Sequence, residues 1–124
     1  MDNKLAQFAK QQFINVETYR RNGQGVPTPV WFVEDQGTLY VRTVDGSGKI
    51  KRIRNNPRVR VTPCDMRGGP LGEWVEGQAR FADAAETKRV DRLLTRKYGF
   101  QKAMFEIMSK LQGRKDTVIA ISVR

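Results

Sequence analysis

The sequence predicts a mainly β fold, an antiparallel barrel that is closed or partly closed and carries helical insertions. Roughly six stretches alternate polar and apolar residues, which is typical of strands with one buried face. Tight turn signals join the first three stretches and a helical stretch precedes the last one, whereas a parallel α/β sheet would alternate strands with helices throughout. The 124 residues suffice for one core, so we expect residues 1–124 to form a single domain.

The first half of the chain is expected to form a short helix and a three-stranded meander. Leu5, Phe8 and Ala9 have helical spacing, which predicts a helix over residues 3–12. The segments RNGQG and DQG are turn signals between alternating stretches. The expected strands of the meander are 13–21, 28–35 and 38–44.

The second half is expected to add a short helix, two strands, a helical insertion and a closing strand. Ser47 is a good N-cap, and Ile50 and Ile53 would form the inner face of the helix that follows it. Asp83 and Glu86 have the spacing of a capping box at the start of a longer helix. The expected helical stretches are 48–56, 83–99 and 104–113, and the expected strands are 58–64, 73–83 and 117–123.

The composition excludes several kinds of site. There is no histidine, which removes Ser-His-Asp and Cys-His nucleophile pairs and most zinc and non-haem iron sites, so no metal is expected. The single cysteine, Cys64, cannot form an internal disulfide, and its place at a strand end favours a small buried residue over a reactive thiol. An enzyme of this composition would take its chemistry from a cofactor. No segment has the pattern of a secretory signal or a membrane span, so the expected location is the cytoplasm.

The net charge of +10 comes from 23 basic and 13 acidic residues. Such a surface attracts anions, which include nucleic acid, anionic lipid and phosphorylated or carboxylated small molecules, although excess charge also serves solubility alone. The charge is concentrated in the segment from Ser47 to Arg60, which holds six cationic residues and no acidic one.

Ser47, Gly48 and Lys49 open the helix of this basic segment and form a candidate anion site. The segment fits neither the dinucleotide fingerprint nor the P-loop, but the first N–H groups of any helix are unpaired and attract anions. A hydroxyl, an ammonium and a glycine that allows close approach to the backbone would add to that attraction. The same residues also describe an ordinary capped helix with solvated lysines, and both interpretations stay open.

The segment VPTPVWF is a candidate surface for a planar ligand. Pro27 and Pro29 hold it near extended geometry and remove two backbone donors, which suits an edge strand facing a ligand or another chain. An edge strand protected against aggregation has the same signature. Trp31 and Trp74 are candidate stacking surfaces, although buried tryptophans are commoner. A basic barrel could also bind nucleic acid, but no aromatic residue lies between Gly46 and Trp74, within the charge cluster.

The segments VPTPVWFVEDQGTLYVRT and SGKIKRIRNNPRVRVTPCD resemble the split-barrel proteins of the pyridoxamine-phosphate-oxidase-like superfamily, which bind flavins and deazaflavins. Within it, the chain is similar to the small deazaflavin (coenzyme F420)-dependent oxidoreductases, from about Phe13 to Phe81. The resemblance implies an FMN-binding split barrel of six or seven antiparallel strands. It also implies a homodimer, formed through a large barrel face, with the cofactor in a groove between the two chains.

The resemblance also implies a set of cofactor contacts. Pyridoxamine phosphate oxidases hold the flavin phosphate with a threonine and, four residues on, Ser-Arg-Lys; this chain matches at Thr43, Ser47 and Lys49 and has Gly48 in place of the arginine. The ring system would lie along the segment 27–31. The expected cofactor-binding residues are Pro27, Thr28, Pro29, Val30, Trp31, Arg42, Thr43, Ser47, Gly48, Lys49, Arg52 and Trp74.

The function that the resemblance implies is hydride transfer between bound coenzyme F420 and an organic substrate, with FMN as the alternative cofactor. F420 ends in a phosphodiester and several carboxylates. The candidates for binding that tail are Arg52, Arg54, Arg58 and Arg60. The residues that bind pyridoxal phosphate in the oxidase are not recognisable, so the oxidase activity is not implied. A flavin or deazaflavin carrier without turnover and a nucleic-acid-binding barrel are the alternatives, and no catalytic residue is assigned.

Overall fold

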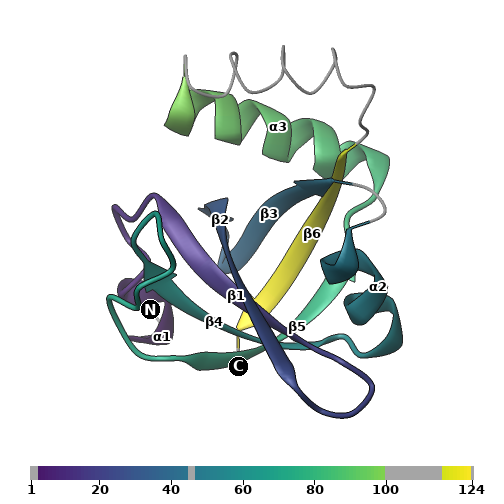
Figure 1. The fold of residues 1–124 in the computed structure, drawn as a ribbon. Helices are drawn as coiled ribbons and strands as arrows, with labels where there is room; N and C mark the ends of the chain where they lie inside the picture. Colours follow the sequence, from purple (N-terminus) through teal and green to yellow (C-terminus); the bar gives the residue numbers. More distant parts are fainter. Residues whose placement is uncertain (1–2, 45–46, 100–115, 124) are drawn as a thin grey trace.

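The computed structural model describes residues 3–44, 47–99 and 116–123. In this part of the chain, six antiparallel strands close into a barrel in the order β1-β2-β3-β6-β5-β4, with β4 paired to β1 (Figure 1). The strands are β1 (Phe13–Tyr19), β2 (Gly25–Asp35), β3 (Thr38–Val44), β4 (Arg58–Cys64), β5 (Val75–Phe81) and β6 (Asp116–Val123). The helices are α1 (Asn3–Ala6), α2 (Gly48–Asn55) and α3 (Ala84–Tyr98). The predicted mainly β antiparallel barrel is confirmed.

The element ends differ from the expected ones by three residues or more in two places, and by one or two residues elsewhere. β2 begins three residues early, because its first part pairs with β1 as the second arm of a hairpin, from Tyr19↔Gly25 to Phe13↔Trp31. The helix expected over 3–12 is too long: α1 ends at Ala6, and Lys10 has a positive φ of 64°, which no right-handed helix contains. The helical stretch expected over 104–113 lies outside the described residues. None of the described helices has the length and apolar character needed to cross a bilayer.

Alternate residues of the strands fill the barrel interior, as the sequence pattern predicts. The fully buried ones include Ile14, Val16, Phe32, Leu39, Val41, Val59, Val61, Ile119 and Ile121. Ile53 of α2 joins this cluster, so the short helix is fixed to the barrel by its apolar face. Gly77 of β5 makes room for β6, since a Cβ there would lie only 3.0 Å from the backbone oxygen of Ser122.

A second apolar layer lies outside the barrel, under α3, which packs against β2 and β6 (Figure 1). Val90, Leu94 and Tyr98 of α3 are buried in it. The Tyr98 hydroxyl accepts a hydrogen bond from the Phe32 amide at 3.1 Å and lies 2.8 Å from the Phe32 carbonyl oxygen. Phe32 is the residue at which β2 leaves β1 and begins to pair with β3, so Tyr98 replaces ladder bonds at that split.

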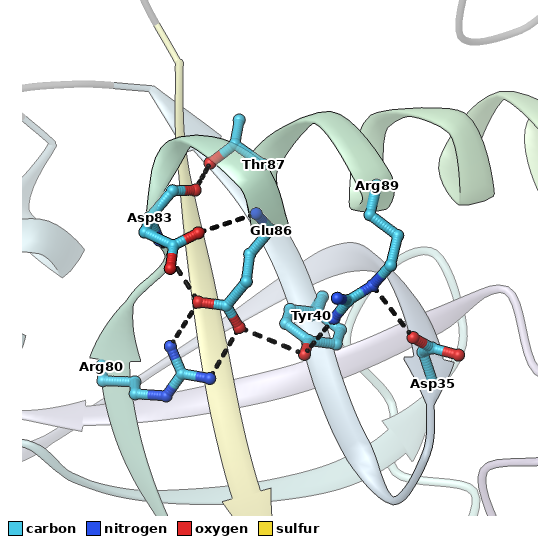
Figure 2. Close-up of polar contacts among 7 residues, drawn as sticks. All are labelled: Asp35, Tyr40, Arg80, Asp83, Glu86, Thr87 and Arg89. Atoms are coloured by element: carbon cyan, nitrogen blue, oxygen red, sulfur yellow. Dashed lines mark hydrogen bonds and ion pairs between the residues drawn. The ribbon is translucent and has the colours of Figure 1, made fainter.

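Polar contacts fix the start of α3 (Figure 2). Asp83 accepts a hydrogen bond from the Glu86 amide at 2.8 Å, and the Glu86 side chain accepts one from the Asp83 amide at 3.3 Å, which confirms the predicted capping box. Two hydrogen bonds of 2.7 Å from Arg80 lower the pKa of Glu86 to about 2. Arg89 donates to the Tyr40 hydroxyl at 2.9 Å, so the network ties α3 to β3 and β5.

Candidate cofactor site

α2 begins as the sequence predicts. Ser47 has extended backbone geometry, and its Oγ accepts a hydrogen bond from the Ile50 amide at 3.4 Å. Ile50 and Ile53 are buried on the inner face, and the helix packs against β1. The unpaired N–H groups of the first turn and the positive end of the helix dipole therefore have a fixed place beside the barrel.

Lys49, in the first turn of α2, is buried, with 7% of its surface exposed. The interpretation of this helix start as one with solvated lysines is therefore wrong for Lys49. Burial, and secondly the Arg52 guanidinium, lower the pKa of Lys49 below its ordinary value of 10.5. Within residues 3–44, 47–99 and 116–123, no carboxylate or hydrogen-bond acceptor pairs with its ammonium. A buried cation without a counter-charge is unfavourable in the free protein, and a bound anion would supply that counter-charge.

The role expected for Gly48 differs from the one found. The expectation was that glycine allows an anion to approach the backbone, but the guanidinium of Arg52 lies there instead, since a Cβ on Gly48 would be 2.6 Å from Nη1 of Arg52. Arg52 also donates from Nε to Oγ1 of Thr18 at 2.6 Å. The four residues Ser47, Gly48, Lys49 and Arg52 thus lie together, as the sequence predicts.

The other arginines of the basic segment have different surroundings. Arg58 forms two hydrogen bonds of 3.0 Å with Glu76, and Arg60 forms an ion pair of 2.7 Å with Glu17. Arg54 lies over the ring of Phe81, with 5.6 Å from Cζ to the ring centroid. Two of the four candidates for an anionic tail are therefore already neutralised by carboxylates.

The segment expected to line the ring system forms the first part of β2. Thr28 and Val30 face the barrel interior, opposite Val16 and Ile14. The outward-facing pairs are Pro27 with Glu17, Pro29 with Asn15 and Trp31 with Phe13. Residues 25–31 form an edge on one side only. They pair with β1 on the other side, and in the described part of the chain β3 pairs only with residues 32–35 of β2.

Trp31 stacks on Tyr98 of α3, with ring centroids 4.6 Å apart and an interplanar angle of 11°. One face of the indole is therefore covered within the chain. The candidate anion site at the start of α2 lies toward the other end of the same segment, because Thr18, which accepts a hydrogen bond from Arg52, pairs with Val26. The strand rises about 16 Å over the five steps from Val26 to Trp31.

Three further residues predicted to contact the cofactor, Thr43, Arg42 and Trp74, each have different neighbours in the structure. Thr43 is buried in β3 beside Thr117. Arg42, its neighbour, faces the other way and pairs with Asp91 of α3 at 3.0 Å. Trp74 lies beneath the Arg60 guanidinium, at 4.9 Å, and lines a pocket of about 760 Å³ with Lys4 and residues of β4 and β5. None of the residues around Lys49 lines that pocket.

Two residues near the site were missed from the sequence. Thr18 lies on the apolar face of an alternating strand, with Ile14 and Val16. A hydroxyl on that face was the sequence feature that could have pointed to it. Arg20 follows that strand. Burial is the larger cause that lowers the pKa of Arg52, and the positive charge of Arg20 is the second. Beside the ring segment, Asn15 donates from Nδ2 to the Gly68 carbonyl at 2.6 Å, while its buried Oδ1 has no hydrogen-bond partner.

Residues 1–122 match the family model described as pyridoxamine 5'-phosphate oxidase. The chain belongs to this family. Its fold is the split barrel of the flavin-binding superfamily, which confirms the coarser part of the resemblance read from the sequence. The sequence has no significant match among curated proteins.

Solved structures share the fold of this family member at low sequence identity. A putative pyridoxamine 5'-phosphate oxidase from Listeria innocua is 20% identical, with a TM-score of 0.70, over 99% of this chain and 92% of that one. A structure described as an F420 reductase is 16% identical, with a TM-score of 0.63, over 100% of this chain and 95% of that one. The heme storage protein from Vibrio cholerae is 13% identical, with a TM-score of 0.72, over 93% of this chain and 83% of that one. These likenesses show the fold alone.

Proposed function

We propose that this family member is an oxidoreductase that binds a flavin-like cofactor with an anionic tail, with coenzyme F420 as the preferred cofactor and FMN as the alternative. The observation that carries the proposal is Lys49, a residue with 7% of its surface exposed in the first turn of a helix, whose charge has no counter-charge in the described part of the chain. Arg52, whose charge adds to the lowering of the Lys49 pKa, is a second cation that no carboxylate of that part neutralises.

The residues present fit such a cofactor. The first-turn amides of α2, Ser47 and Lys49 would hold the phosphate, and the ring system would lie along residues 27–31 of β2. The link from Arg52 through Thr18 to Val26 supports this placement, because the anion site and the ring segment then follow one another along a single strand. Trp31, held by its stack on Tyr98, would give that segment a rigid aromatic end.

The bound cofactor would supply hydride-transfer chemistry, and the chain would bind and orient it. The absence of histidine leaves no Ser-His or Cys-His nucleophile pair. The only cysteine, Cys64, is buried, and burial raises the pKa of its thiol to about 11. The F420 reductase among the similar folds agrees with this class of function.

A homodimer that lines each site with both chains is part of the proposal. Large apolar side chains are exposed at Met66 and Leu71, with 71% and 59% of their surfaces accessible, and residues 25–31 pair on one side only in the described structure. Light scattering should give twice the chain mass of 14.2 kDa. A dilute monomer that binds cofactor as tightly as the concentrated protein would contradict the shared site.

Haem storage, the role of one protein of similar fold, has weaker support. Haem iron takes axial histidine, cysteine, methionine or tyrosine ligands, and this chain has no histidine and only a buried cysteine, so a haem here would depend on a methionine or a tyrosine. A flavin or deazaflavin carrier without turnover would use the same site as the oxidoreductase. Steady-state oxidation of reduced cofactor with candidate acceptors separates the carrier from the enzyme.

The experiment that tests the proposal is a set of three titrations at physiological salt, with F420, with FMN and with a short single-stranded DNA. Absorbance and fluorescence changes should saturate with a flavin-like cofactor and not with DNA. If F420 binds more tightly than FMN, the deazaflavin assignment stands; the reverse order makes FMN the cofactor. Submicromolar DNA binding without binding of either cofactor would refute the proposal.

A further inference from the structure

The C-terminal end of α3 brings an ammonium group to one end of the ring segment, residues 27–31 of β2. Nζ of Lys97 donates a hydrogen bond to the Phe32 carbonyl at 2.9 Å, and Phe32 directly follows Trp31. The candidate anion site lies toward Val26, at the other end of the segment. Lys97 therefore lies where the ring system of the cofactor would end, away from the phosphate.

The surroundings of this ammonium are aromatic. Nζ lies 3.7 Å from the ring centroid of Phe32 and 5.2 Å from that of Tyr98. Tyr98 is in turn stacked on Trp31, so the ammonium and the indole belong to one aromatic cluster. Phe32 and Tyr98 are buried, whereas Lys97 itself is exposed, so a ligand from solvent has access to the side chain.

Lys97 is the group of this cluster that exchanges a proton near neutral pH. Burial lowers the pKa of Lys97 to about 8, and among the described residues no charged group adds to the shift. The other titratable group here is Tyr98, whose pKa burial raises to about 12, so its hydroxyl stays protonated in the same range. A general acid works best when its pKa lies close to the pH at which it acts.

The position of the Lys97 side chain does not depend on its charge. A neutral amine keeps two N–H groups, so it still donates to the Phe32 carbonyl after it has lost a proton. The Tyr98 hydroxyl lies 2.8 Å from the same carbonyl oxygen and 2.7 Å from the Gln12 carbonyl oxygen, so Phe32 also has a second donor within reach. A proton therefore leaves and returns at Lys97 without loss of these contacts.

We infer that Lys97 is the proton donor of the reaction, and that it binds and protonates the carbonyl oxygen of an acceptor held beside Trp31. The inference rests on the proposed function and adds to it a catalytic residue and a class of acceptor, a planar ketone conjugated to a C=C bond. The flat aromatic cluster suits a planar acceptor, and the ammonium suits an oxygen that becomes negative during the reaction.

The step balances with the groups named. When the acceptor takes a hydride at the far carbon of its C=C bond, the π electrons move toward oxygen and the ketone becomes an enolate. One N–H bond of Lys97 breaks as its proton goes to that oxygen, and the amine that remains takes a proton from water. The enol returns to the saturated ketone in water.

A phenolate tests the oxyanion site without turnover. p-Nitrophenol ionises near neutral pH and its phenolate is coloured, so absorbance at about pH 6 shows whether the bound ligand has lost its proton. The wild type should bind the phenolate. Lys97→Met should weaken that binding roughly 10- to 150-fold, the loss of one charge-assisted contact, while Lys97→Arg should keep it. Lys88→Met is the matched control, because Lys88 is exposed on the same helix and its loss should change affinity by about twofold at most.

The rate of reaction separates the proton of Lys97 from its charge. Oxidation of the reduced cofactor by cyclohex-2-enone, followed in single turnovers, should be fast below the Lys97 pKa of about 8 and slow above it. Arginine keeps the charge but gives up no proton, so Lys97→Arg and Lys97→Met should both be about 100-fold slower or more, without that fall in rate with pH. Cofactor affinity should be unchanged in both, because Lys97 lies away from the anion site.

The outcomes distinguish this inference from the proposed function. An absent phenolate signal, a bound phenolate that survives Lys97→Met, or equal rates in the wild type and Lys97→Met would overturn the role of Lys97, while cofactor binding would leave the proposed function in place. Phenolate binding that depends on Lys97, in a protein that binds neither FMN nor F420, would support the oxyanion site and refute the flavin-like cofactor.

Discussion

Replacing Lys49 with methionine should make the free protein more stable and the cofactor complex weaker. The side chain is buried and its ammonium has no partner in the described structure, so the free protein carries the penalty of a desolvated charge. Removing a buried unpaired polar group relieves about 1–3 kcal/mol, and methionine keeps the apolar stem that fills the space. For a chain of this size that corresponds to an increase of several degrees in Tm. Binding of a phosphorylated cofactor should weaken roughly 10- to 150-fold, because a charge-assisted hydrogen bond is lost.

Thermal unfolding and cofactor titration, measured on the same samples, give both numbers. Lys51→Met is the matched control, because Lys51 is exposed on the same helix and should change neither quantity by much. The loss at Lys49 should persist in high salt, since a buried charge is poorly screened, while any effect at Lys51 should vanish. A Lys49→Met protein that is less stable than the wild type and binds cofactor equally well would refute the reasoning, because Lys49 would then be a structural residue.

Three further outcomes follow from the fold. Tyr98→Phe leaves the Phe32 amide without its partner, so urea unfolding should show a loss of about 1–3 kcal/mol; an unchanged midpoint would contradict the role of the hydroxyl at the strand split. Burial raises the pKa of Cys64 to about 11, so iodoacetamide should label the folded protein slowly at pH 8.5 and the urea-unfolded protein quickly, and equal rates would show an open thiol. Arg80 lowers the pKa of Glu86 from 4.5 to about 2, so its contribution to stability is present above pH 4.5 and lost as the pH falls toward 2. The gap in urea midpoint between wild type and Glu86→Gln should therefore be constant above about pH 5.5 and close below it, and a gap that does not change with pH would show that the ion pair contributes nothing.

Local patterns were enough to predict most of the fold. The alternation of apolar residues located every strand, and the N-cap at Ser47 and the capping box at Asp83 located two helices. The capping signals depend only on residues within the same helical turn, and the structure keeps both of them. The first helix was predicted too long because three apolar residues with helical spacing do not establish a helix when the chain must turn at Lys10 into β1.

The site was predicted less completely, because its chemistry depends on register between distant strands. The pairing of Arg60 with Glu17, and of Arg58 with Glu76, follows from which residues lie opposite each other in the barrel, and no local pattern contains that information. The burial of Lys49 likewise depends on how α2 packs against β1. The resemblance named the residues that lie together at the start of α2, and the structure shows which of the nearby cations are already neutralised.

The central claim is that the anionic end of a flavin-like cofactor binds at the start of α2. It is tested most directly by following the backbone amide signals of the ¹⁵N-labelled protein during a titration with F420 or FMN. The account predicts that the amides of Gly48 and Lys49 shift and saturate together with the signals of residues 28 and 30–31 of β2, at the affinity given by fluorescence. Shifts confined to the pocket around Trp74, with the amides of α2 unmoved at saturation, would contradict it.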